Sequence, residues 1–240
     1  MYMVEVEKVV GRIAQEIVAW QSQNSGLFRL GVCGGRFANE LYRALAVRTD
    51  VDWGRVLLIL TDERFVESAS SDSNLGVLAE NLIFPAGISL DNVVFFDTEE
   101  GADYLESAEM MDRQLAELLA ERAPLFDLLI LSAGPDFHIA SLFPESLTVD
   151  RDCLLLAQTA TTEKFAVPRR LSLSYKALRQ FGQLCLLVVG EDKANVRKQI
   201  AETGLVDAKL AEELPLYQLF ADAGAAAKLV DDSRAWLVGG

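Results

Sequence analysis

The sequence predicts an α/β fold in which a doubly wound, mostly parallel sheet carries helices on both faces. Three observations point to this fold. Four short runs are predominantly apolar, which is typical of strands buried on both faces of a sheet. Patterns with helical spacing lie between these runs, and such alternation favours parallel strands joined by right-handed crossovers. The 240 residues are 51% hydrophobic and 24% charged, as expected for one packed domain spanning residues 1–240.

The strands are predicted where most residues of a short run are apolar. The strong candidates are Phe28 to Cys33, Val56 to Thr61, Asp127 to Ser132 and Leu184 to Val189. Two shorter candidates are Val93 to Phe96 and Cys153 to Ala157.

The helices are predicted where apolar residues recur every three or four positions, which places them on one face. Val6, Val10, Ile13 and Ile17 show this spacing in the first of them. The predicted helices are residues 3–22, Ala38 to Ala46, residues 100–122 and Asp192 to Glu202.

The charge and the hydropathy pattern exclude several kinds of partner. With 22 basic and 36 acidic residues, the net charge is −14, so the chain repels a phosphate backbone and is expected to bind no nucleic acid. Its apolar stretches fall short of the roughly 20 residues that span a bilayer. The first residues lack the pattern of a signal peptide. We therefore expect a cytoplasmic protein that does not bind a membrane.

The sequence predicts neither a metal nor a cofactor. Cys33, Cys153 and Cys185 are odd in number and widely spaced, so they form no disulfide framework. The chain has one histidine, which excludes the common His-rich zinc sets. Neither a G-x-G-x-x-G motif nor a P-loop is present, so nucleotide binding has no support.

Unusual residues follow each of the four strong strands. These segments are Gly34 to Arg36, Thr61 to Arg64, Ser132 to His138 and Gly190 to Lys193. Because ligands bind outside the carboxyl ends of the strands in open α/β sheets, we expect the four segments to share one site.

Glycines and cations predict an anion site there. Gly34 and Gly35 open a helix, where backbone amides can face an anion; the alternative is a tight turn without a ligand. A cation at the start of a helix, such as Lys193, is disfavoured unless an anion is bound. For Arg170 the alternative is surface charge on a strand edge. The candidates for an anion clamp are Arg64, Arg170 and Lys193, with Arg36 as a fourth.

Polar residues after the second strand are further candidates. Asp62 and Arg64 come directly after a buried strand, which favours a role in a pocket over a solvated charge cluster. Ser73 and Asn74 precede a helical pattern and are good helix caps. A cap and a ligand contact both use the start of a helix, so the two interpretations are compatible.

The single histidine, His138, is the strongest candidate for catalysis. An imidazole, with a reference pKa of about 6.5, is the natural general base at neutral pH. Asp136, two residues earlier, is placed to orient the ring. The alternative is a histidine packed on the surface or in the core. Since no G-x-S-x-G turn is present, attack by an activated water is favoured over an acyl-enzyme.

These segments resemble the motifs of the 6-phosphogluconolactonase family. The run FDLLILSAGPDFHIASLFP, from Phe126 to Pro144, resembles the family signature FDLxLLGxGxDGHxASLFP. Four further segments match in order between about residues 30 and 200. They are Gly34-Gly35 (SGGSTP in the family), Asp62-Glu63-Arg64 with Asp72-Ser73-Asn74 (DER…DSN), Arg170 to Ser174 (RxTLT) and Gly190 to Lys193 (GxxK).

The resemblance implies a Rossmann-like fold shared with glucosamine-6-phosphate deaminases and ribose-5-phosphate isomerases. It also implies metal-free hydrolysis of 6-phosphogluconolactone to 6-phosphogluconate, a step of carbohydrate metabolism in the pentose phosphate pathway. His138 would activate water. The cations Arg64, Arg170 and Lys193 would bind phosphate or stabilise developing charge, and the Gly34-Gly35 loop and the Ser73-Asn74 turn would cradle the sugar phosphate. The expected partner is this small molecule, bound by a monomer or a small homo-oligomer.

The chain departs from the family pattern in the ligand-facing loops. Arg36-Phe37-Ala38 stands where the family has Ser, Thr and Pro, while Ser132 and Phe137 each replace a glycine. The departures raise the alternative of a sugar-phosphate-binding or partner-binding protein without turnover. An amino-sugar-phosphate isomerase or deaminase is a third possibility. It is disfavoured because Ser141 to Pro144 stands in place of an FNEP-like stretch.

Overall fold

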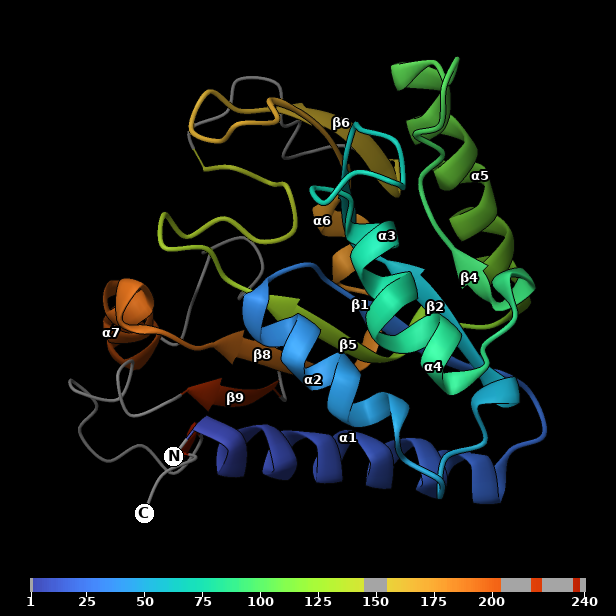
Figure 1. Ribbon diagram of the computed structural model, residues 1–240, viewed down its shortest axis with the longest axis vertical. Helices are drawn as coiled ribbons and strands as arrows, with labels where there is room; N and C mark the ends of the chain where they lie inside the picture. Colours follow the sequence, from blue (N-terminus) through green and yellow to red (C-terminus); the bar gives the residue numbers. More distant parts are fainter. Residues whose placement is uncertain (1, 145–154, 204–216, 222–234, 238–240) are drawn as a thin grey trace.

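A parallel sheet of seven strands forms the centre of the molecule (Figure 1). The structure, a computed structural model, describes residues 2–144, 155–203, 217–221 and 235–237. The strand order is β10-β9-β8-β5-β1-β2-β4, and every paired neighbour is parallel. The strands are β1 (Phe28–Val32), β2 (Val56–Leu60), β4 (Val93–Val94), β5 (Phe126–Ser132), β8 (Phe181–Val188), β9 (Tyr217–Ala221) and β10 (Ala235–Leu237).

The strand order reverses between β1 and β5. From β1 the chain proceeds outward to β2 and β4, then returns to the other side of β1 to form β5 and β8. Such a reversal leaves a crevice at the carboxyl ends of the two central strands, because their connections leave in opposite directions. The segments after β1 and β5 therefore lie beside one another.

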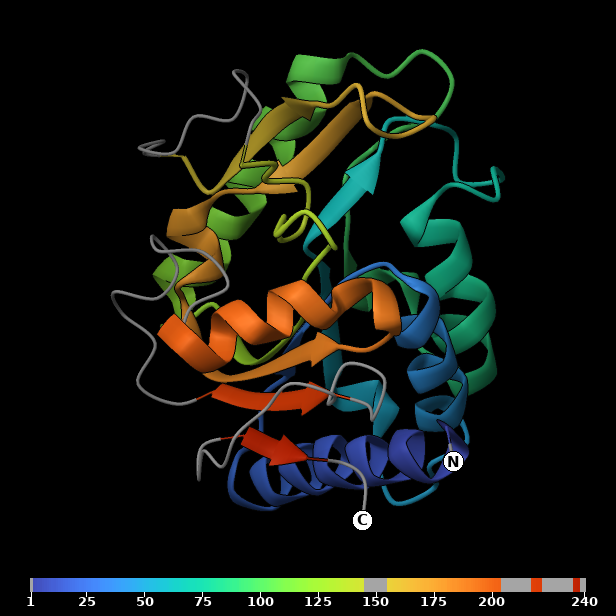
Figure 2. The same cartoon turned by 90° about the vertical axis from the view of Figure 1, so that its left-hand side faces the viewer.

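Helices cover both faces of this sheet (Figures 1 and 2). Alternate residues of β2 belong to separate cores, since Leu58 packs in one hydrophobic cluster and Ile59 in the other. The first cluster contains side chains of α1 (Tyr2–Gln23), α2 (Arg36–Ala46) and the helical segment 74–86, in which a π-helical turn joins α3 (Asn74–Leu78) to α4 (Phe84–Ala86). The second contains side chains of α5 (Tyr104–Glu121), α6 (Tyr175–Leu178) and α7 (Ala194–Thr203).

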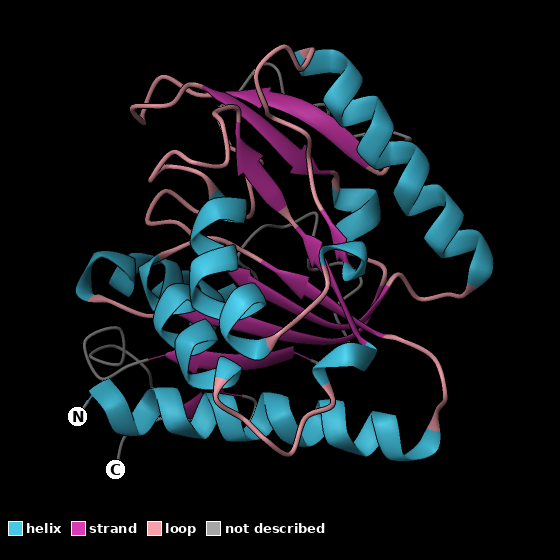
Figure 3. Ribbon diagram, turned by 45° about the vertical axis from the view of Figure 1, so that its right-hand side comes forward, coloured by secondary structure: helices cyan, strands magenta, loops and turns pink. Residues whose placement is uncertain are grey.

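A second, smaller sheet stands over the carboxyl ends of the first (Figure 3). It is antiparallel, in the order β3-β7-β6, with β3 (Asp62–Arg64), β7 (Arg169–Leu173) and β6 (Ala157–Thr161). Helix α5 packs beside it, and the Tyr104 hydroxyl donates to the carbonyl oxygens of Ala160 and Arg170. The sheet matters for the site because it carries two arginines to the edge of the crevice.

The doubly wound α/β fold predicted from the sequence is confirmed, with several differences at individual elements. Asp62 to Arg64, expected as a loop, forms the edge strand β3. Part of the strand expected at Cys153 to Ala157 lies outside the described residues, and β6 begins only at Ala157. Helix α5 begins at Tyr104 rather than residue 100, because the Asp103 carboxylate caps it through the amides of Leu105 and Glu106. No helix in the described part of the chain is long and apolar enough to cross a membrane.

Candidate active site

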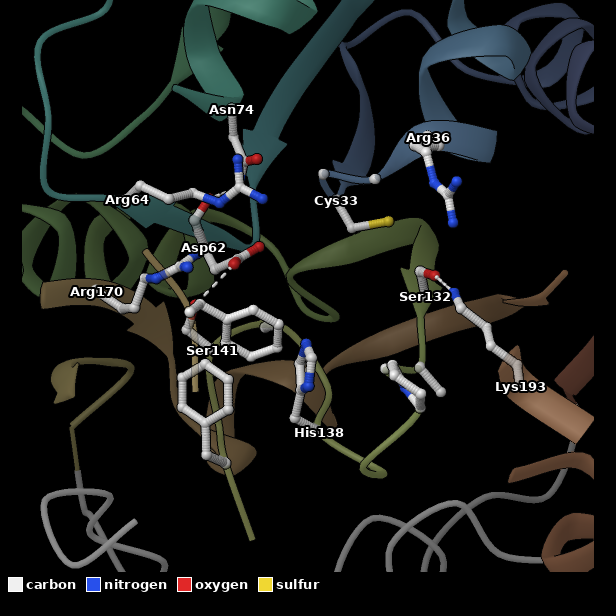
Figure 4. A pocket seen from close by; sticks show the side chains of 18 of the residues that line it. Cys33, Arg36, Asp62, Arg64, Asn74, Ser132, His138, Ser141, Arg170 and Lys193 are labelled. Atoms are coloured by element: carbon white, nitrogen blue, oxygen red, sulfur yellow. Dashed lines mark hydrogen bonds between the residues drawn. The ribbon is translucent and has the colours of Figure 1, made fainter. Parts of the chain in front are cut away.

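A cavity of about 310 Å³ opens at the carboxyl ends of the central strands (Figure 4). All four segments that follow the strong strands line it, as the sequence predicts, and the second sheet closes one side. Nine of the predicted site residues line the cavity. They are Gly34, Gly35, Arg36, Asp62, Arg64, Asn74, His138, Arg170 and Lys193.

The imidazole of His138 is fixed from one side by a carboxylate. Its Nδ1 lies 2.5 Å from Oδ1 of Asp136, which itself does not line the cavity. The rings of Phe143 and Phe165 pack around it, with centroids 4.9 and 5.6 Å away. Because Asp136 accepts the Nδ1 proton, the lone pair is left on Nε2, and the ring extends toward the cavity.

The carboxylate of Asp136 is kept ionised by its neighbours. Burial alone would raise the pKa of Asp136. The hydrogen bond and charge of His138, and the nearby Lys164, outweigh burial, so that this pKa lies below its ordinary value. An ionised Asp136 stabilises the imidazolium that forms when His138 takes up a proton.

The turn that carries His138 has an unusual backbone. Phe137 has φ 70° and Ala140 has φ 51°, both in the left-handed region that non-glycine residues seldom adopt. A Cβ on Gly134 would lie 2.1 Å from Cε1 of His138, so only glycine fits there. The backbone at position 137 therefore has the positive φ that the family's glycine adopts easily. Phe137 meets this demand at a cost of about 1–2 kcal/mol.

One wall of the cavity is cationic and largely buried. Arg64 on β3 and Arg170 on β7 are directly paired across the strands. Arg170 is 7% exposed, and its Nε donates to the carbonyl oxygen of Val167 at 2.8 Å. Burial, and then the charge of Arg64, lowers the pKa of Arg170. Two like charges placed opposite one another are unfavourable unless an anion lies between them, so this pair is suited to bind one.

Acidic and polar groups hold this wall in place. Asp62 is buried, and its Oδ2 accepts a hydrogen bond of 2.8 Å from the Ser141 hydroxyl. Asn74 donates from Nδ2 to the carbonyl oxygen of Asp62 at 2.9 Å. Arg64 donates from Nη1 to the carbonyl oxygen of Asp72 at 2.6 Å. Each side chain of the wall is therefore tied to backbone or to another side chain.

Glu63 is an organising residue that was not among the predicted site residues. Its fully buried carboxylate accepts hydrogen bonds of 2.6–2.7 Å from the backbone amides of Arg64, Asn74 and Leu75. Burial raises the pKa of Glu63 to about 7, although these hydrogen bonds oppose the rise. The only sign of this role in the sequence was the position of Glu63 between Asp62 and Arg64. That position is equally typical of a solvated charge cluster.

Ser73 acts as a helix cap in the structure. Its hydroxyl accepts from the amide of Gly76 and donates to Oε2 of Glu63, both at 3.1 Å. It is fully buried and does not line the cavity, unlike its neighbour Asn74. The capping interpretation of Ser73 therefore describes its geometry, and the expected ligand contact has no surface through which to form.

The opposite wall is built from backbone and from the long cationic side chains of Arg36 and Lys193. Gly35, with φ 126°, precedes the first residue of α2, whose N-terminus opens on the cavity. A Cβ on Gly34 would lie 2.1 Å from Oδ1 of Asn74, so that residue must also be glycine. Lys193 donates from Nζ to the Ser132 hydroxyl at 2.8 Å. Arg36 is exposed and forms no ion pair with any described residue.

The two phenylalanines that depart from the family pattern do not fill the cavity. Phe37 is 8% exposed and belongs to the core between α2 and the sheet. Phe137 packs against the second hydrophobic cluster. Neither lines the cavity, whereas Arg36 does. The two phenylalanines therefore leave the cavity open, while Arg36 and Ser132, the departures that line it, add a cation and a hydroxyl.

Several lining residues were not among the predicted site residues, and Cys33 and Phe165 were missed for different reasons. The thiol of Cys33 lines the cavity, and burial raises its pKa to about 12, so it stays neutral. Phe165 lies in the connection between β6 and β7, and nothing in the sequence places that connection over His138. Among the described residues, no three His, Cys, Asp or Glu side chains gather where they would hold a metal ion.

The comparisons with known proteins agree with this geometry. Residues 4–224 match the family model described as glucosamine-6-phosphate isomerases/6-phosphogluconolactonase. The chain belongs to this family. Within it, the chain is 31% identical over 216 residues to the 6-phosphogluconolactonase of Streptomyces coelicolor, covering 85% of this chain and 82% of that protein.

Other members of the glucosamine-6-phosphate isomerase/6-phosphogluconolactonase family extend the comparison. A 6-phosphogluconolactonase-like protein of Saccharomyces cerevisiae is 31% identical over 185 residues, or 73% of this chain; the match covers only 57% of the yeast protein. The crystal structure of a 6-phosphogluconolactonase from Thermotoga maritima superposes with a TM-score of 0.77 at 25% identity, covering 90% of this chain and 94% of that one.

Proposed function

We propose that this chain hydrolyses 6-phosphogluconolactone to 6-phosphogluconate. The observation that carries the proposal is the His138–Asp136 pair, which faces a cavity with cations on two opposite walls. Relatives named as 6-phosphogluconolactonases support the substrate. Action in the cytoplasm, as a monomer or small homo-oligomer and without nucleic acid, stays a prediction from the sequence.

The proposed reaction is base-assisted addition of water. Nε2 of His138 takes a proton from a water molecule while the water oxygen attacks the lactone carbonyl carbon. The carbonyl oxygen becomes an oxyanion. When the bond from this carbon to the ring oxygen breaks, the imidazolium returns its proton to the departing oxygen. One water is consumed, and the product has a free hydroxyl and a carboxylic acid, which releases one proton to the solvent to become the carboxylate. Asp136 stabilises the intermediate imidazolium.

The cations of the two walls meet the negative charges of this reaction. The substrate carries a phosphate throughout and gains an oxyanion in the transition state. Arg64 and Arg170 on one wall, and Lys193 and Arg36 on the other, are placed to share these charges. The start of α2, where Gly35 and Arg36 line the cavity, adds a helix N-terminus that favours an anion. In a chain of net charge −14, these local cations are what attract an anionic substrate.

The alternative of a binding protein without turnover depends on the departures from the family pattern. Phe37 lies in the core, Phe137 packs against it, and the His138–Asp136 pair is intact. Two changes line the cavity: Arg36, which adds positive charge, and Ser132, whose hydroxyl accepts a hydrogen bond from Lys193. These observations favour catalysis over a degenerate site.

The test measures hydrolysis of freshly generated 6-phosphogluconolactone with the spontaneous rate subtracted. We expect a saturable rate above background, with 6-phosphogluconate as the product and no release of ammonia from amino-sugar phosphates. Heat-inactivated protein serves as the control. Binding of 6-phosphogluconate without any rate above background would contradict the proposal and favour the binding protein instead.

A further inference from the structure

The connection between β6 and β7 contacts the His138–Asp136 pair directly. Lys164 lies in this connection, and its Nζ is 3.4 Å from Oδ2 of Asp136. The other oxygen of the same carboxylate, Oδ1, contacts Nδ1 of His138. One carboxylate is thus shared between an imidazole and an ammonium group that come from different parts of the chain.

The position of Lys164 is defined by its own loop. The amide of Thr162 donates to the carbonyl oxygen of Pro168 at 3.0 Å and closes the loop between the two strands. The amide of Lys164 donates to the Thr162 hydroxyl at 3.2 Å. The next residue, Phe165, places its ring edge-on to His138 and 5.6 Å from the guanidinium carbon of Arg170. The loop is therefore attached both to the catalytic pair and to the cationic wall.

We propose that Lys164 is a positioning residue for the His138–Asp136 pair. It holds the second oxygen of Asp136 and withdraws part of the negative charge that His138 would otherwise face alone. This keeps the carboxylate in one orientation and makes the imidazolium form of His138 release its proton more readily. The base is then ready to accept a proton from water. As an account of catalysis, the inference rests on the proposed function.

A surface ion pair of no consequence is the alternative. Lys164 is 44% exposed, and such pairs contribute little to stability. The sharing of Asp136 separates the two explanations, because a charge so close to the pair changes proton binding even where it does not change folding. The other charged groups of the cavity are Asp62, Arg64 and Arg170 on the second sheet and Arg36, Asp192 and Lys193 on the far wall. These stay in place when Lys164 alone is replaced.

The single histidine of the chain makes a direct test possible. The imidazole protons of His138 can be followed by NMR as pH is varied, without turnover and without ambiguity of assignment. The variants are Lys164→Met, Lys164→Arg and Lys8→Met. The last is the matched control, because Lys8 is exposed on α1 and its replacement changes the net charge equally.

We expect the titration midpoint of His138 to move to higher pH in Lys164→Met, by roughly half a pH unit or more. The midpoints of Lys164→Arg and Lys8→Met stay close to that of the wild type. The melting temperatures of all three variants lie within a few degrees of the wild-type value. The acid limb of kcat/KM for lactone hydrolysis moves in the same direction. A midpoint in Lys164→Met that coincides with that of Lys8→Met would overturn the proposal. A shifted midpoint in a protein that does not hydrolyse the lactone would leave the positioning role standing and remove the proposed function.

Discussion

The two walls of the cavity achieve the same positive charge by different means. The wall on the second sheet holds Arg64 and Arg170 in cross-strand register, with Arg170 almost wholly buried. The wall at α2 offers backbone amides beside Gly35 and the long side chains of Arg36 and Lys193. The first wall is organised before any ligand arrives, whereas an exposed side chain such as Arg36 must lose conformational freedom to bind. Arg36, a departure from the family pattern, lies on the second wall, where a new side chain disturbs no packing.

This comparison predicts that the largest effect comes from the organised wall. Arg170→Met should lower kcat/KM for the lactone by about 10²–10³-fold, because a pre-placed charge near the reacting groups is lost. Arg169→Met is the matched control, since its side chain on the same strand lies outside the cavity, over the ring of Phe65. Equal activity of the two variants would show that the buried charge of Arg170 is not what makes the wall on the second sheet effective.

The carboxylate that supports the organised wall should affect how stability depends on pH. The folded-state pKa of Glu63 is raised to about 7 from an ordinary 4.5. Folded protein therefore binds a proton that unfolded protein has lost, and this stabilisation disappears as pH rises from about 4.5 to 7. In the wild type, the free energy of unfolding measured in urea should fall by about 2–3 kcal/mol over this range because of Glu63. In Glu63→Gln this part of the fall should be absent. The exposed Glu67→Gln should leave the wild-type slope, and an unchanged slope in Glu63→Gln would place the titration elsewhere.

In the turn that carries Phe137, glycine should be more stabilising than alanine, which reverses the usual order of the two residues. Both Phe137→Ala and Phe137→Gly lose the same ring from the hydrophobic cluster. Because φ at this position is 70°, the glycine variant should be the more stable of the two by about 1 kcal/mol. Thermal unfolding of the pair measures the difference. The usual order, with alanine ahead, would mean that the turn relaxes to another conformation.

The wall at α2 should give the smallest effect on activity. Arg36→Ala is expected to raise KM for the lactone about three- to tenfold with little change in kcat, because an exposed cation contributes to binding more than to the chemical step. Arg36→Lys keeps the charge and should recover most of the affinity. A loss in kcat as large as that of Arg170→Met would show that both walls act on the transition state.

The sequence predicted the parts of this structure that depend on local pattern. Phe28 to Cys33 is apolar except for Arg29, so its burial in the central sheet could be inferred directly. Gly34 and His138 could be assigned to one site because each follows a buried strand. The pairing of Arg64 with Arg170 could not be predicted, since the two residues are distant in sequence and β3 is a three-residue strand of charged side chains. The contact of Lys164 with Asp136 depends on the same unpredicted sheet.

The most direct test of the account compares the wild type with His138→Gln, which is close to histidine in size. Rates of lactone hydrolysis and affinities for 6-phosphogluconate are measured for both. The account predicts that kcat falls about 10²–10⁴-fold while the affinity changes only a few-fold, because the base is lost and both cationic walls remain. A His138→Gln variant that hydrolyses the lactone within a few-fold of the wild-type rate would contradict the central claim.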